Sequence, residues 1–157
     1  MLEHGFSGFV SVAELTSGKW KTVPKEKGVY LVIRRSYKEP EFLTKSVGGH
    51  FKNRDPTVDV IILKEKWIKD TEIVYIGQAG GNGSKSTLQK RIRSYLKFGS
   101  GQPVGHWGGR YIWQLKDYRD LLIAWKVTEE DPSMIESTMI EKFRQNYGNR
   151  PFANLMK

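Results

Sequence analysis

Short runs of apolar residues interrupt a mostly polar chain, and four of them have the composition of β-strands. They span residues 28–33, 59–63, 72–76 and 121–127, and each is rich in β-branched or aromatic side chains. Gly28 marks the start of the first run. The last run, Leu-Leu-Ile-Ala-Trp-Lys-Val, is apolar along nearly its whole length, which predicts a central strand.

Helical periodicity and capping residues predict three helices. Ser11 and Glu14 have the spacing of a capping box and open a brief helix that ends near residue 18. A longer helix is predicted from residue 86 or 87 to about 98, and another from Asp131-Pro132 to about 147. Helices interspersed with a short sheet predict an α/β or α+β class, with a small mixed or antiparallel sheet flanked by helices.

The length of 157 residues fits one domain, and 38% hydrophobic residues supply a core. Residues 1–27 read as a lead-in to the first strand. Residues 34–56 are polar and basic and contain Gly48-Gly49, so we interpret them as an insertion or mobile loop. They are too short a stretch to separate two cores.

Charge gives the first indication of a partner. The chain has 26 Lys and Arg against 17 Asp and Glu, a net charge of +9, which is typical of proteins that bind a phosphate backbone. It has no cysteine and three scattered histidines, so any metal is expected to have oxygen ligands. No membrane span or secretory signal is apparent, and we expect a cytoplasmic location.

One glutamate stands out on the last predicted helix. Glu136 rises from the edge of an apolar stripe that includes Ile140 and Phe143, whereas Glu141 lies on the polar face. Glu136 can be explained as the partner of Ser133 in a capping box, or as a metal ligand or general acid/base. Asp131 is the better cap, and it would place Glu136 beyond the first turn.

The middle helix divides in a similar way. Lys90, Arg93 and Lys97 recur on one side as a basic face, opposite an apolar stripe. Arg91 projects from the border of that stripe, where its guanidinium could clamp a phosphate or a carboxylate. The alternative is an arginine whose stem simply covers apolar surface.

A glycine-rich loop precedes this helix and ends in Lys85-Ser86. A strand, a glycine loop and a helix are also the context of a phosphate-binding loop of nucleotide hydrolases, but Ala79 and Ser84 occupy places where that motif needs glycine. A nucleotide hydrolase is therefore disfavoured. The backbone N–H groups of the loop, and Lys85 within it, are candidates for contact with a nucleic-acid phosphate.

The two tyrosine-containing strands carry a family resemblance. Gly28-Val29-Tyr30 closely resembles the first signature of the GIY-YIG nucleases, and Tyr75-Ile76-Gly77 is identical to the second. The order of the residues that follow strengthens the resemblance, because Arg91, Glu136 and Asn154 come after these strands where the family places its active-site residues. The resemblance covers residues 28–154 and implies a standalone nuclease domain that hydrolyses DNA.

The resemblance also implies roles for individual residues. Tyr30 would be the general base, Tyr75 would position the water, and Arg91 would clamp the scissile phosphate. Glu136 would hold one divalent ion, Mg2+ or Mn2+, since a lone carboxylate completed by water and phosphate oxygens suits a hard cation. Asn154 would fix the site by hydrogen bonds. One such site cuts one strand, so a double-strand cut would need a dimer or two encounters.

The chain departs from the family pattern in two places. Residues 31–74 separate the signatures where members have about a dozen residues, so we interpret residues 34–70 as an insertion that shapes substrate binding. Tyr95 stands where many members carry a histidine one turn after the arginine. His106 is a candidate stand-in for another histidine that some members have, and a candidate nucleic-acid contact. A non-catalytic nucleic-acid-binding module remains the alternative, and it would use the basic face and exposed aromatics such as Trp107 and Trp113.

Overall fold

The chain folds into an α+β structure built on one antiparallel sheet. The structure is a computed structural model and describes residues 2–155. The strands are β1 (Ser7–Ser11), β2 (Gly28–Ile33), β3 (Ile73–Ala79) and β4 (Leu122–Val127). Their order in the sheet is β1-β4-β2-β3, and each neighbouring pair is antiparallel. The predicted fold class is confirmed, and β3 is an edge strand.

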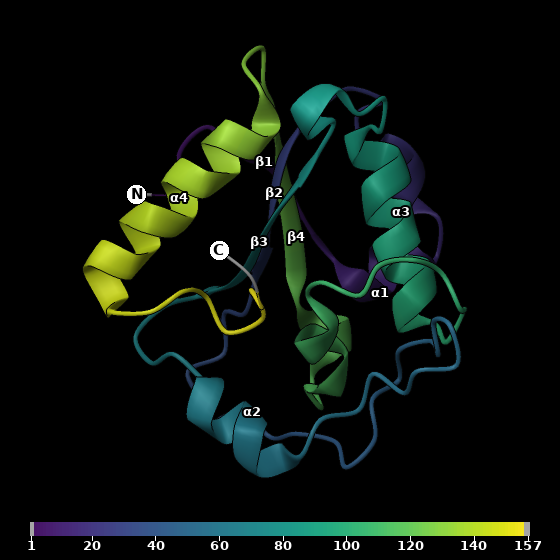
Figure 1. Cartoon of the computed structure of the whole chain (residues 1–157), viewed down its shortest axis with the longest axis vertical. Coiled ribbons are helices and arrows are strands. Elements are labelled where there is room, and N and C mark those ends of the chain that lie inside the picture. The colour runs from purple at the N-terminus through teal and green to yellow at the C-terminus, as the bar shows by residue number, and fades with distance from the viewer. Residues whose placement is uncertain (1, 156–157) are drawn as a thin grey trace.

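Helices cover both faces of this sheet. The α-helices of residues 2–155 are α1 (Val12–Thr16), α2 (Val60–Lys66), α3 (Leu88–Gly99) and α4 (Pro132–Tyr147). Figure 1 shows α4 on one side of the strands and α1 and α3 on the other. None of the helices among residues 2–155 is long and apolar enough to cross a membrane.

The strand β2 explains how the sheet builds two cores. Its six residues are all buried, and alternate side chains point to opposite faces. Tyr30 and Val32 join the core under α3, whereas Leu31 packs with the residues under α4. Because both faces are covered, the strand appears in the sequence as a continuous apolar run without a polar face.

Local capping signals placed the helix starts correctly. The hydroxyl of Ser11 accepts a hydrogen bond from the N–H of Glu14, and Thr87 does the same for α3. Asp131 caps α4, with Pro132 in the first helical turn. The short predicted helix ends at Thr16.

Two elements differ from the prediction. Residues 59–63, predicted as a strand, form the start of α2, because Asp59 caps the N–H of Ile61 and the residues that follow favour helix. Only Leu63 of this helix is buried. The strand β1 lies within the predicted lead-in, and it pairs with β4 through a bulge between Gly8 and Val10.

The insertion, residues 34–70, is tied to the body of the protein rather than loose. The buried side-chain amide of Gln114 accepts a hydrogen bond from the N–H of Val58 and donates to the carbonyls of Leu43 and Val58. The N–H of Gly49 also donates to the carbonyl of Phe98 at the end of α3, over 2.8 Å. These bonds satisfy backbone groups that have no strand partner.

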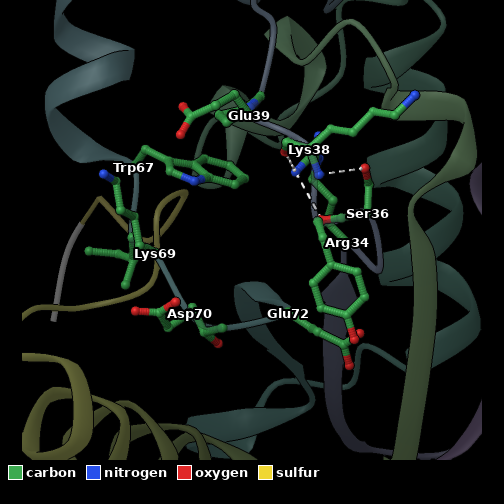
Figure 2. Close-up of a pocket in the computed structure, with 12 residues that line it drawn as sticks. Arg34, Ser36, Lys38, Glu39, Trp67, Lys69, Asp70 and Glu72 are labelled. Carbon is green, nitrogen blue, oxygen red and sulfur yellow. Dashed lines mark hydrogen bonds between the residues drawn. The ribbon is translucent and has the colours of Figure 1, made fainter.

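Arg34 anchors the first residues of the insertion. Its Nε donates to Asp117 over 2.9 Å, and Nη1 donates to the carbonyls of Ser36 and Lys38. The guanidinium also lies over the ring of Trp67, 5.4 Å from its centroid, beside a cavity of about 430 Å3 that Figure 2 shows. That cavity contains none of the residues predicted to be catalytic.

Candidate active site

Four of the five predicted catalytic residues lie around one small pocket. They come from four different elements: Tyr30 from β2, Tyr75 from β3, Arg91 from α3 and Glu136 from α4. The pocket has a volume of about 200 Å3. Its remaining lining residues belong to the end of β3 and the loop after it: Gln78, Ala79, Gly80, Gly81, Ser84 and Ser86.

The glycines of the two signature tripeptides are required by close packing. Gly77 pairs with Tyr30 across β2 and β3, and a Cβ on Gly77 would lie 2.4 Å from Cζ of the Tyr30 ring. A Cβ on Gly28 would lie 2.2 Å from the carbonyl oxygen of Lys126. Each glycine therefore allows a neighbour to approach the strand, and Gly77 provides the surface against which the Tyr30 ring lies.

The two signature tyrosines point to the same face of the sheet. Tyr30 is opposite Gly77, and Tyr75 precedes Gly77 by one strand repeat, so their side chains share a face. Their ring centroids are 6.0 Å apart. Tyr95 of α3 packs against both rings and donates its hydroxyl hydrogen to the carbonyl of Gly109 over 2.6 Å.

His106 contacts Tyr30 from the interior of the protein. Its Nδ1 lies 3.1 Å from the carbonyl oxygen of Gly108, which can only accept, so Nδ1 carries the hydrogen. Burial, with the charge of Arg91, lowers the pKa of His106 to about 3, and the ring is neutral at physiological pH. Nε2 is then an acceptor for the hydroxyl of Tyr30 at 3.2 Å.

The expectation that His106 touches nucleic acid is therefore wrong. Its side chain is fully buried and stacks on Tyr95, with ring centroids 4.1 Å apart. Tyr95 stands at the position where many GIY-YIG nucleases have a histidine. In this protein the ring of His106 lies directly against the ring of Tyr95. No sequence signal indicated the contact of His106 with Tyr30, because 76 positions separate these two residues.

The electrostatic environment keeps the tyrosines protonated in the free protein. Burial raises the pKa of Tyr30 to about 12, and the charge of Arg91 opposes this rise. Burial also raises the pKa of Tyr75 well above its ordinary value. Arg91, half-buried in the first part of α3, is thus the positive charge that favours a phenolate in this pocket.

Glu136 does not belong to a capping box. Asp131 is the N-cap of α4, and the hydroxyl of Ser133, which lies inside the helix, donates to the side-chain oxygen of Asn82. The backbone N–H of Asn82 also donates to Asp131, so the glycine-rich loop is docked on the start of α4. Glu136 is half-buried and reaches the pocket at the edge strand β3.

Asn154 supports the edge strand from outside the pocket. Its side-chain oxygen accepts from the N–H of Ile76 over 3.0 Å, and its side-chain nitrogen donates to the carbonyl of Ile76 over 2.9 Å. Ile76 lies between Tyr75 and Gly77, so these bonds fix the backbone of the second signature. Asn154 is 8% exposed and is not among the residues that line the pocket.

The predicted basic contacts lie outside the pocket. Lys85, Lys90 and Arg93 are exposed, and Lys97 is half-buried. The guanidinium of Arg93 lies 3.9 Å from the centroid of the Trp20 ring.

The expectation of exposed aromatics is wrong for Trp113, which is 1% exposed. Trp107 is half-buried.

The pocket fits a cation that needs few protein ligands. Glu136 is the one carboxylate among the described residues that line it, and residues 2–155 contain no cluster of three or more His, Asp or Glu side chains suited to a metal. A closed protein cage is thus not available there. A hard cation such as Mg2+ uses one or two carboxylates together with water and substrate phosphate oxygens, which is compatible with Glu136 in a polar pocket.

Comparisons with family models, with curated proteins and with solved structures found no match to this chain. The resemblance to the GIY-YIG nucleases therefore depends on the residues and on their arrangement. The arrangement adds an observation that is independent of the sequence pattern: Tyr30, Tyr75, Arg91 and Glu136, which are spread over more than 100 positions of the chain, line the same pocket.

Proposed function

We propose that the protein is a metal-dependent endonuclease that hydrolyses phosphodiester bonds in DNA at this pocket. The observation that carries the proposal is the convergence of two tyrosines, an arginine and a glutamate from four separate elements. Structural roles alone do not require these four side chains to meet at a pocket, whereas phosphodiester hydrolysis needs an acceptor for a water proton, a cation for the phosphate and a metal ligand.

Tyr30 is the group proposed to accept the proton of the attacking water. The neutral hydroxyl donates its hydrogen to Nε2 of His106, so Tyr30 must first release that proton to solvent. The resulting phenolate can then take a proton from water, which restores the hydroxyl. With a pKa of about 12, only about one molecule in ten thousand would carry the phenolate at pH 8 in the free protein. Additional positive charge from the substrate complex is therefore needed to make Tyr30 an effective base.

Arg91 and Glu136 are proposed to handle the phosphate. The guanidinium of Arg91 presents planar N–H donors that match two phosphate oxygens, and its charge also acts on Tyr30 and Tyr75. Glu136 would hold a Mg2+ or Mn2+ ion, which supplies charge neutralisation for the phosphate and for the departing oxygen. Tyr75, whose ring is 6.0 Å from that of Tyr30, would help to position the water.

A plasmid assay tests the proposal. Supercoiled plasmid incubated with the protein and Mg2+ should be converted to the open-circular form, and chelation of the metal should stop the reaction. Tyr30→Phe should abolish the conversion, whereas Tyr37→Phe should not, because Tyr37 is 97% exposed and outside the pocket. If the wild-type protein leaves the plasmid supercoiled but still retards it in a gel, the result favours a non-catalytic nucleic-acid-binding module over a nuclease.

A further inference from the structure

Two arginines that are far apart in the sequence lie over one tryptophan ring. The guanidinium of Arg54, in the insertion, is 4.6 Å from the centroid of the Trp107 ring, and that of Arg110 is 4.7 Å from it. Arg110 also lies 5.6 Å from the ring centroid of Tyr111. Neither the basic face of α3 nor the pocket includes these residues.

The two guanidinium groups of this pair are close enough for their charges to act on each other. Burial lowers the pKa of Arg110, and the charge of Arg54 lowers it further, so the two guanidinium groups repel each other. Among residues 2–155, neither of them forms an ion pair with an aspartate or glutamate. An anion bound between them would relieve this repulsion.

The insertion is shaped so that Arg54 reaches the tryptophan. The N–H of Arg54 donates to the carbonyl of Phe51 over 3.1 Å, and Lys52 and Asn53 between them both have positive φ, at 54° and 61°. Two such residues form a tight turn that suits the tip of a hairpin. Phe51 packs against Gly105, where a Cβ would lie 3.3 Å from its ring, and this contact holds the tip beside Trp107.

The segment from His106 to Arg110 connects this cluster to the pocket. His106 contacts the hydroxyl of Tyr30, and a Cβ on Gly109 would lie 2.9 Å from the ring of Tyr75. Arg110 directly follows Gly109 in the chain. The segment that carries Arg110 therefore packs behind Tyr30 and Tyr75, two of the residues that line the pocket.

We propose that Arg54 and Arg110 bind the sugar-phosphate backbone of the DNA whose scissile phosphate occupies the pocket. A guanidinium stacked on an aromatic ring keeps its N–H donors at the edge of its plane, where they can contact phosphate oxygens. The two guanidinium groups lie 4.6 and 4.7 Å from the centroid of the Trp107 ring and compete with a base for that ring, so we expect the contact to be with the backbone. This inference rests on the proposed nuclease function.

Binding to a short fluorescein-labelled DNA duplex, measured by anisotropy over a series of salt concentrations, tests the inference. Arg54→Gln and Arg110→Gln should each raise Kd about five- to tenfold and should each reduce the slope of log Kd against log salt by about one, since each removes a phosphate contact. Arg35→Gln is the matched control: Arg35 is exposed and lies 5.3 Å from the ring centroid of Phe9, away from the pocket.

The outcomes separate the two proposals. If the wild type binds and nicks DNA but the Arg54→Gln, Arg110→Gln double variant has the Kd of Arg35→Gln, the phosphate contact is overturned and the nuclease stands. If the double variant loses affinity but the wild type nicks no plasmid, the contact is supported and the nuclease is overturned. The charge-keeping variants Arg54→Lys and Arg110→Lys should retain most of the salt slope, and melting temperatures show that each variant is folded.

Discussion

The hydroxyl of Tyr30 lies 3.2 Å from Nε2 of His106, and the hydrogen bond can run in only one direction. Nδ1 of His106 must donate to the carbonyl of Gly108, so Nε2 of the neutral ring accepts from Tyr30. His106 is thereby a positioning residue, because it fixes the orientation of the Tyr30 phenol, whose phenolate form is proposed to take a proton from water.

A double-mutant cycle tests this coupling. His106→Asn should lower the nicking rate by about tenfold to a hundredfold, because the Tyr30 hydroxyl loses its fixed orientation. Tyr30→Phe should abolish nicking, and adding His106→Asn to it should cause no further loss, since both changes act through one hydroxyl. If the two losses multiply, His106 acts independently of Tyr30. The rate measured against pH should also change shape in His106→Asn, which a purely structural role would not produce.

The buried histidine also predicts how stability depends on pH. Burial lowers the pKa of His106 in the folded state to about 3 from an ordinary 6.5, so between these values the unfolded chain binds a proton that the folded protein does not. The free energy of unfolding should therefore fall as the pH falls from about 6.5 toward 3, by up to about 1.4 kcal/mol per pH unit from this residue.

Denaturant unfolding at several pH values measures this contribution. His106→Asn should flatten the pH dependence in that window, and His4→Asn, which changes an exposed histidine, is the matched control. Equal slopes in all three proteins would contradict a neutral, buried His106.

Much of the sheet and both long helices follow from local sequence. Predicted strands at residues 28–33, 72–76 and 121–127 correspond to β2, β3 and β4, because each is a sustained apolar run. Thr87 and Asp131 mark helix starts by hydrogen bonds to nearby backbone N–H groups, which the sequence alone encodes.

The elements that were missed depend on distant contacts. The strand β1 has few apolar residues and a bulge, and it exists because its backbone pairs with β4. The apolar run at residues 59–63 favoured a strand, but these residues form the start of α2, because Asp59 caps the helix. The same holds at the candidate site: the sequence predicted Tyr30 and Arg91, but the contacts of His106 and of Arg54 cross between remote segments.

The signature glycine of β3 should tolerate no side chain. Gly77→Ala would place a methyl group 2.4 Å from the Tyr30 ring, so the tyrosine or the strand must shift. We expect a loss of about 1–3 kcal/mol in the free energy of unfolding and a strong loss of nicking. Gly108→Ala is the control for stability, because its Cβ would meet only the Tyr75 hydroxyl, at 4.0 Å. Equal melting temperatures for the two variants would contradict the packing role of Gly77.

The basic face of α3 should contribute a salt-dependent part of DNA binding. Charge reversal of Lys90, Arg93 and Lys97 to Glu should raise Kd steeply at low salt and less at high salt. The melting temperature should fall only slightly, through loss of the contact of Arg93 with Trp20. Reversal of Lys64 and Lys66 on the exposed side of α2 is the control for net charge. If both sets weaken binding equally per charge, α3 has no special role in docking.

Glu136 and Glu141 offer the sharpest comparison, because they lie on one helix and differ in surroundings. Glu136 lines the pocket with Tyr30 and Arg91, whereas Glu141 is exposed. Glu136→Gln keeps the shape of the side chain and removes the charge proposed to hold the cation, so nicking should fall by about a hundredfold or more.

DNA binding should survive or strengthen in Glu136→Gln, since a negative charge leaves the surface that faces the phosphate. Glu141→Gln should match the wild type in rate and in melting temperature. The measurement is the nicking rate of both variants at saturating Mg2+, alongside their melting curves. Because Asp131 already caps α4, a loss of nicking in Glu136→Gln with an intact fold cannot be attributed to a lost cap. Equal rates for the two variants would remove Glu136 as the metal ligand, and with it the main chemical argument for a nuclease.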